Sequence, residues 1–179
     1  MSLRNTYQSY GLISKLLHAI IALLVICMLS VSFFMSDIGI SNIYTIHKLT
    51  GLSILSFAII MLVWELFNPK PAYPITMARW EQILAKSVHH CLLLLIILMP
   101  MSGWIFSTAA GKPPMLINIT LPFPGIAHSQ TVIHLFKDAH KVIAWIIIGL
   151  LSLHILAALK HWLLNKDGIM QRMWSFSQD

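Results

Sequence analysis

Hydrophobic residues gather into four long runs along this 179-residue chain, and short segments that hold most of the polar and charged residues separate the runs. The runs cover about residues 16–35, 47–67, 88–106 and 139–164. Each approaches the ~20 apolar residues that a helix needs to cross the hydrocarbon core of a bilayer. The short alternating segments of a transmembrane β-barrel are absent. The pattern predicts an all-α integral membrane four-helix bundle, with four transmembrane helices in one domain over residues 1–179.

The connection after the third run, residues 107–138, is long for a link between two antiparallel helices. It contains two turn-forming segments, Gly111-Lys112-Pro113-Pro114 and Pro122-Phe123-Pro124-Gly125. Loops of this length are usually functional or disordered. Because apolar residues lie between the two turns, we expect an ordered lid on the outer face of the membrane.

The composition supports a membrane location, since 58% of the residues are hydrophobic and only 10% are charged. A soluble domain usually carries roughly 25% charged residues. The net charge of +6 does not indicate nucleic acid as a partner, because the basic residues form no patch on any predicted element. They lie between the apolar runs, where lysine and arginine set the orientation in the bilayer. The expected surroundings are therefore a lipid bilayer.

The basic residues are divided unequally between the two predicted membrane surfaces. One side holds eight of the twelve, together with both ends of the chain: Arg4, Lys15, Lys70, Arg79, Lys86, Lys160, Lys166 and Arg172. The other side holds Lys48, Lys112, Lys137 and Lys141. Because positive charge is retained on the cytoplasmic side, both termini are predicted to be cytoplasmic.

Histidines lie within or at the ends of all four hydrophobic runs. An imidazole inside a membrane is costly and by default indicates function. His140 and His154 are 14 residues apart on the fourth run, a spacing that returns to nearly the same helix face and separates the rings by ~21 Å along the axis. One helix with two stacked imidazoles suits two metal centres, one near each membrane surface.

Matching each histidine by depth predicts two pairs, His47 with His140 near the outer surface and His18 with His154 near the inner one. Two neutral imidazoles fill both axial positions of a haem iron, so electron transfer is the natural chemistry rather than oxygen activation. The chain has no C-x-x-C-H motif, which argues against covalent attachment. The prediction is two non-covalent haem b groups, with His89 as a competitor of His18 because depth does not separate them.

The remaining histidines have ordinary explanations to weigh against a functional one. His90, His128 and His134 are interpreted as interfacial polar residues. His161 lies about one heptad beyond His154, nearer to the inner surface. At headgroup depth it suits a site that binds a quinone carbonyl and delivers protons. A Lys-His-Trp sequence at a helix end is equally typical of an interfacial anchor.

Several segments carry a resemblance to a known family. They are Ser14-Lys15-Leu16-Leu17-His18, Ile46-His47-Lys48-Leu49-Thr50-Gly51, Trp80-Glu81 ahead of His89, Ser107-Thr108-Ala109-Ala110-Gly111-Lys112-Pro113, His140, His154 and Ala157-Ala158-Leu159-Lys160-His161. In this order and spacing the chain resembles the bacterial cytochrome b561 family over nearly its whole length. The histidine register of the fourth run is the most specific part.

The resemblance implies two b-type haems bound by His18, His47, His140 and His154, and electron transfer between an outer donor and the membrane quinone pool. Some members of the family look like superoxide oxidases, so the expected activity is that of a superoxide:ubiquinone oxidoreductase. On that likeness Lys112 would attract the superoxide anion, together with Lys48, Lys137 and Lys141. His89 and His161 would lie on the quinone side.

One departure from the family pattern concerns the inner end of the second run. Two arginines often stand there in the family, whereas this chain has Met61 and Glu65. Arginine there could pair with haem propionates or shape the quinone site. The departure leaves open how the inner haem is anchored and whether quinone reduction is retained.

Two other functions fit the same residues. The chain could be a cytochrome subunit that relays electrons between the quinone pool and a periplasmic redox protein. It could also be a histidine-rich metal transporter without haem, although the paired depths favour a cytochrome.

Overall fold

The computed structural model describes residues 2–35, 37 and 42–174 of the chain. Its four long helices are α1 (Leu12–Ser32), α2 (Ile43–Phe67), α3 (Arg79–Ala109) and α4 (Gln130–Lys160). All four are long and apolar enough to cross a membrane. The prediction of an all-α bundle with four membrane spans is therefore confirmed.

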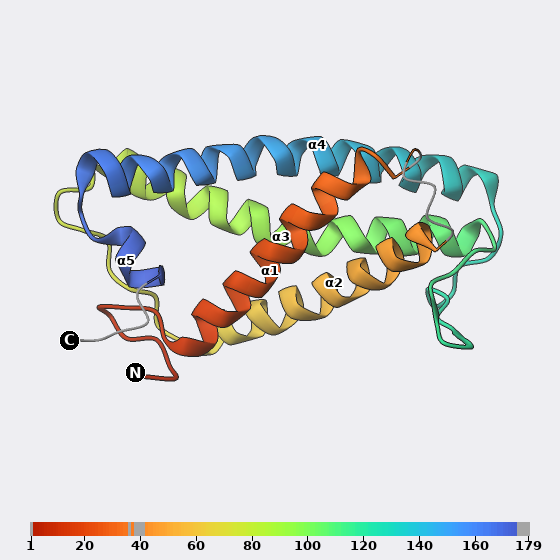
Figure 1. Cartoon of the computed structure of the whole chain (residues 1–179), viewed down its shortest axis with the longest axis horizontal. Helices are drawn as coiled ribbons and strands as arrows, with labels where there is room; N and C mark the ends of the chain where they lie inside the picture. The colour runs from red at the N-terminus through yellow and green to blue at the C-terminus, as the bar shows by residue number, and fades with distance from the viewer. Residues whose placement is uncertain (1, 36, 38–41, 175–179) are drawn as a thin grey trace.

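Helices that follow one another in the chain pack side by side in the bundle. The packing of α3 against α4 is the most extensive, followed by α2 with α3 and α1 with α2. Figure 1 shows α1 crossing the bundle diagonally in front of the other helices. In the described part of the chain, α1 makes little backbone contact with α4, so the bundle has an open side between these two helices.

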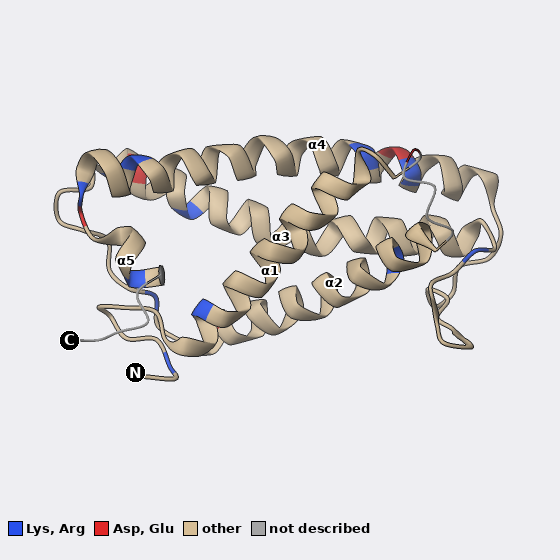
Figure 2. Cartoon of the chain, viewed as in Figure 1, with Lys and Arg blue, Asp and Glu red and all other residues tan. Residues whose placement is uncertain are grey.

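The N-terminal segment and a short helix, α5 (Ile169–Trp174), lie at one end of the bundle, opposite the lid (Figure 1). An even number of spans places them on the same side of the membrane. The assignment of that side to the cytoplasm stays a prediction from the basic residues. Figure 2 shows charged residues at both ends of the bundle, while the central stretches of the four helices carry none.

Many large hydrophobic side chains lie on the outside of the bundle. Leu23, Trp145 and Leu156 are each 64% exposed, while a small core forms around Ile21 and Ile54. In water such exposure would be unfavourable, but lipid tails are as apolar as leucine. The bilayer, rather than a large interior, therefore accommodates most of the apolar surface.

Local signals in the sequence explain where the helices begin and end. The first turn of α1 is capped by the N-terminal segment, because the Leu12 and Ile13 N–H groups donate to the carbonyls of Ser2 and Leu3. Helix α2 ends at Phe67, just before an Asn-Pro-Lys-Pro sequence that excludes continuation.

All four helices begin before the hydrophobic runs do, α1 and α2 by four residues and α3 and α4 by nine. Helix α3 starts at Arg79 instead of 88, and α4 starts at Gln130 instead of 139. The Ser129 hydroxyl caps α4 by accepting a hydrogen bond from the Val132 N–H at 3.4 Å. Hydropathy follows the lipid, whereas a helix can continue into water. The non-helical part of the outer connection is thus shorter than the predicted 107–138, and it spans residues 110–129.

This shorter connection contains a two-stranded antiparallel hairpin, β1 (Met115–Leu116) with β2 (Ile119–Thr120). Hydrogen bonds tie the segment after it to the end of α3. The Trp104 indole N–H donates to the Leu121 carbonyl at 2.7 Å, and the Phe123 N–H donates to the Thr108 hydroxyl at 3.0 Å. The lid is therefore held over the outer end of α3.

Candidate metal centres

The outer histidine pair joins α2 to α4. The ring centroids of His47 and His140 lie 6.3 Å apart, with an interplanar angle of 64°. His47 stands in the first turns of α2, whereas His140 stands three turns into α4, because α4 begins so far ahead of the hydrophobic run. The two residues that were matched by depth are therefore neighbours in space.

The inner level contains three histidines instead of two. The His18 ring on α1 and the His154 ring on α4 have centroids 6.2 Å apart, at 59°. The His89 ring on α3 lies closer to His154, at 5.0 Å and 72°. The bundle thus gathers both candidates for the inner partner around one imidazole.

The centroid distances test whether an iron ion fits between the rings. A metal–imidazole bond is about 2 Å and the ring centre lies roughly 1.2 Å further, so two rings on opposite sides of one metal have centroids about 6.4 Å apart. The distances of 6.3 Å and 6.2 Å agree with that value. The 5.0 Å between the His89 and His154 centroids is well below that value.

The His140 ring is held in one tautomer by α3. Its Nδ1 lies 2.9 Å from the Met99 carbonyl oxygen. A carbonyl can only accept, so Nδ1 carries the hydrogen and Nε2 keeps its lone pair. This is the arrangement of a metal-ligating histidine, whose second nitrogen donates to a backbone carbonyl.

His47 lacks such support. Its Nδ1 is buried and has no hydrogen-bond partner among the residues that the structure describes. A buried polar atom without a partner is unfavourable. A metal bond to the ring would recover part of that cost if Nδ1 is the ligand. The outer pair therefore combines one fixed ring with one ring whose tautomer the protein leaves free.

Helix α3 comes very close to His140. A Cβ atom at Gly103 would lie 3.0 Å from the ring Cε1 and 3.2 Å from Nδ1, closer than ordinary van der Waals contact. A side chain at this position would push the ring a few tenths of an ångström away, so glycine favours this close approach. Neither this contact nor that of Ser102 with the ring was predicted from the sequence.

An apolar cleft of about 450 Å³ lies on the open side of the bundle, between α1 and α4. Its walls are Ile26, Leu29, Ser30, Phe33 and Phe34 from α1, with Ile148, Leu151, Ser152 and Ile155 from α4. These are the two helices that carry His18 and His154. Neither histidine is among the lining residues, and the α1 wall lies beyond His18 along that helix.

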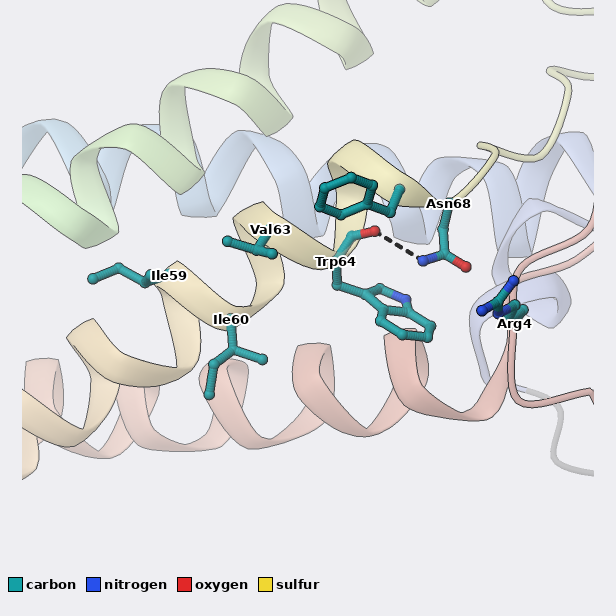
Figure 3. A pocket seen from close by; sticks show the side chains of 7 residues that line it. Arg4, Ile59, Ile60, Val63, Trp64 and Asn68 are labelled. Carbon is teal, nitrogen blue, oxygen red and sulfur yellow. Dashed lines mark hydrogen bonds between the residues drawn. The ribbon is translucent and has the colours of Figure 1, made fainter.

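A second groove, of about 600 Å³, lies at the end of α2 near the N-terminal segment (Figure 3). Its polar wall contains Arg4, Trp64 and Asn68, whose amide donates to the Trp64 carbonyl at 3.0 Å. The other wall is a stripe of α2: Ile59, Ile60, Val63 and Phe67. No histidine lines it, so it is separate from both pairs.

At the inner end of α4, the predicted quinone-side residue His161 is buried. It begins a π-helical turn, η1 (His161–Asn165), a feature that often occurs at functional sites. Its Nδ1 lies 2.5 Å from the Asp167 carboxylate and 3.2 Å from the Asn165 amide. Burial raises the pKa of Asp167, but hydrogen bonds from His161 and the Ile169 N–H outweigh it and hold the pKa below its ordinary value.

Glu65, one of the two α2 residues that differ from the family pattern, has a partner close by in the chain. Glu65 pairs with Lys70 at 2.7 Å, and Met61 packs against the core around Ile54. Another ion pair at the same end joins Lys160 of α4 to Glu81 of α3 at 2.5 Å. These contacts hold the ends of the helices together.

Two of the predicted steering lysines lie side by side at the outer end. The Lys48 ammonium donates to the backbone carbonyl of Lys112 at 2.7 Å. Lys48 follows His47 directly, so the lid residue Lys112 lies near the outer pair. Lys137 and Lys141 are exposed on α4.

The other histidines lie outside the two pairs. His90 and His134 are exposed. His128 ties the lid to α3, through Nδ1 and the Ala109 carbonyl at 2.8 Å.

Four membrane-spanning helices with paired imidazoles define a class of protein, the membrane cytochromes with non-covalent haem. The chain matches the family described as prokaryotic cytochrome b561 over residues 9–176, and it belongs to that family. It is 26% identical over 178 residues to "Cytochrome b561 homolog 2" of Escherichia coli (strain K12), covering 97% of this chain and 95% of that protein. The family and the membrane location predicted from the sequence are confirmed: the protein is a membrane electron carrier that uses haem b.

Proposed function

We propose that the chain holds two haem b groups, one between His47 and His140 and one between His18 and His154, and that it carries electrons from superoxide at the outer face to ubiquinone. The observation that carries this proposal is the distance between the two ring centroids within each pair, 6.3 Å for His47 and His140 and 6.2 Å for His18 and His154. The 14-residue spacing on α4 sets the two levels ~21 Å apart along the helix. When bound, a haem with two axial imidazoles supplies one-electron transfer without an open site for oxygen.

His18, rather than His89, is assigned as the inner ligand. The 5.0 Å contact between His89 and His154 leaves too little room for a metal between them. His89 instead packs its ring against the inner ligand and lies on the quinone side of the bundle.

The outer lysines would act on the substrate before any electron moves. Lys48 and Lys112 give this end of the bundle a positive field close to His47, to which Lys137 and Lys141 add. Such a field raises the encounter rate with a small anion. Each superoxide gives up one electron and leaves as dioxygen.

His161 and Asp167 would serve the acceptor at the inner surface. Ubiquinone takes two electrons and two protons to form ubiquinol, so two superoxide anions are consumed for each quinone. Asp167 is ionised at neutral pH and accepts the hydrogen bond from His161 Nδ1. The other ring nitrogen, Nε2, would donate a hydrogen bond to a quinone carbonyl when it also carries a proton, and would pass that proton on.

A relay to a periplasmic redox protein is the second candidate, and the lid favours it. Its hairpin exposes apolar side chains, with Ile117 86% exposed and Ile119 65% exposed. An apolar tip beside a positive surface is a plausible docking site for an acidic partner.

Haem content and the response to superoxide test the proposal. A pyridine haemochrome assay on the purified protein is expected to give two haem b per chain. Superoxide from an enzymatic source should then reduce the haems with no partner protein, and added superoxide dismutase should prevent it. One haem or none would reject the two-site assignment. Two haems that only a redox protein reduces would support the relay instead.

A further inference from the structure

Helix α3 presents two acceptors to the same nitrogen of His140. The Nδ1 atom lies 2.9 Å from the Met99 carbonyl oxygen and 3.0 Å from the Ser102 hydroxyl oxygen. The hydroxyl itself donates to the Met99 carbonyl at 2.7 Å. Its proton is therefore engaged, and a lone pair of Ser102 faces the imidazole N–H.

The three groups form a closed arrangement in an apolar surrounding. Ser102 is 4% exposed, and the Phe106 ring covers His140 edge-on at 5.7 Å between centroids. Away from water, hydrogen bonds of this kind are stronger, and losing one acceptor is costly. The missing side chain of Gly103 lets the ring come this close to the helix.

The other three proposed ligands have no such support. His47 Nδ1 is buried without a partner. Among the residues that the structure describes, neither His18 nor His154 has a hydrogen bond from a ring nitrogen to the protein, whereas His140 has two such contacts.

We propose that Ser102 is a positioning residue that fixes the tautomer and orientation of His140 and lowers the reduction potential of the outer iron. This inference rests on the proposed ligation by His140. Acceptors at Nδ1 make the imidazole a more basic ligand. A more basic ligand stabilises the ferric state more than the ferrous state, so the outer haem becomes harder to reduce.

Redox titration of Ser102→Ala, followed by optical and electron paramagnetic resonance spectra, tests the inference. The equilibrium constant for reduction of the outer haem should rise about threefold to tenfold, the range of one hydrogen bond. For one electron this is a shift of about 30–60 mV upward. The resonance of the outer ferric haem should change, and the inner haem should keep its potential and spectrum.

Ser107→Ala is the matched control. Ser107 is also buried on α3, 3% exposed, and its hydroxyl also donates to a backbone carbonyl, that of Trp104. It contacts no histidine among the described residues, so both potentials should remain as in the wild type. If Ser102→Ala does not give a folded holoprotein, Ser102→Cys replaces it, because sulfur is a weak acceptor and should give a smaller shift in the same direction.

The outcomes separate this inference from the proposed ligation. A Ser102→Ala protein with two haems and unchanged outer potential and spectrum overturns the inference and leaves the ligation standing. An equal shift in Ser107→Ala also overturns it, since the effect would then be a general loosening of α3. Retention of both haems in His140→Ala overturns the ligation itself.

Discussion

The two histidine levels of this bundle are built differently. At the outer level, α3 holds the His140 ring through the Met99 carbonyl and Ser102, and the partner ring of His47 has a buried, unpartnered nitrogen. At the inner level, His18, His89 and His154 gather with ring contacts alone among the described residues. One level is thus oriented by hydrogen bonds and the other by packing.

This difference bears on how each site would respond to loss of its metal. A ring fixed by hydrogen bonds keeps its orientation without a ligand, because the backbone that holds it belongs to a long helix. Rings held by packing can turn when the group between them leaves. We therefore expect the outer site to be the more preorganised of the two.

The largest expected effect is the loss of a whole haem from one level. His47→Ala or His140→Ala should remove the outer haem and leave one haem b per chain, because each substitution deletes one axial ligand. The haemochrome assay measures the content, and a reduced-minus-oxidised spectrum shows which haem remains.

His134→Ala is the control for both variants, since His134 is exposed on α4 outside the pairs. It should keep two haems. A His140→Ala protein with two haems would contradict ligation by His140, and one with none would contradict the independence of the levels.

The inner level offers a sharper comparison because it has a spare imidazole. His18→Ala should lose the inner haem, whereas His89→Ala should keep it, since the His89–His154 centroid distance of 5.0 Å fits ring contact and not ligation. Haem counting separates the two variants. If His89→Ala loses a haem while His18→Ala keeps both, His89 rather than His18 is the inner ligand.

Much of this comparison could be foreseen from the sequence. Transmembrane helices need about 20 apolar residues, so the four runs predict the bundle, and the depth of each histidine predicts the neighbours of His140 and His154. The starts of α3 and α4 could not be foreseen in this way. The residues from Gln130 onward are helical but too polar to be part of a hydrophobic run.

The supporting contacts were out of reach for a different reason. A backbone carbonyl such as that of Met99 has no sequence signal, and Gly103 acts through the absence of a side chain. The Pro-Met-Ser-Gly sequence at 100–103 was the available hint. Likewise, the His161–Asp167 contact depends on a π-helical turn and a left-handed residue, Lys166, which helical periodicity does not predict.

The outer end differs from the inner end in the charge that it offers to a small anion. Lys112→Glu should slow reduction of the haems by superoxide about twofold to fourfold at low salt, the size of one charge reversal about 10 Å away in water. Because exposed charges are screened within a Debye length of about 8 Å at physiological salt, the effect should shrink as salt is added. Stopped-flow reduction at several ionic strengths measures it.

Lys86→Glu makes the same charge change at the other end of the bundle, and its rates should match the wild type. An equal slowing in both variants would show a response to net charge alone. A Lys112→Glu rate that is unchanged at every ionic strength would remove the steering role.

The smallest expected effect concerns the hydrogen-bonded contact at the inner end, where Asp167 joins His161 to the start of α5. Its pKa lies below the ordinary 3.8, so the ionised carboxylate stabilises the fold above that pH, and the stabilisation is lost as the pH falls through the lower folded value. The melting temperature of the wild type should therefore fall more between about pH 5 and pH 3 than that of Asp167→Asn, which has no charge to lose. Thermal unfolding at several pH values measures this difference. Asp138→Asn, an exposed carboxylate at the outer end, should instead follow the wild-type curve. Parallel curves for the wild type and Asp167→Asn would mean that the contact adds nothing that depends on charge.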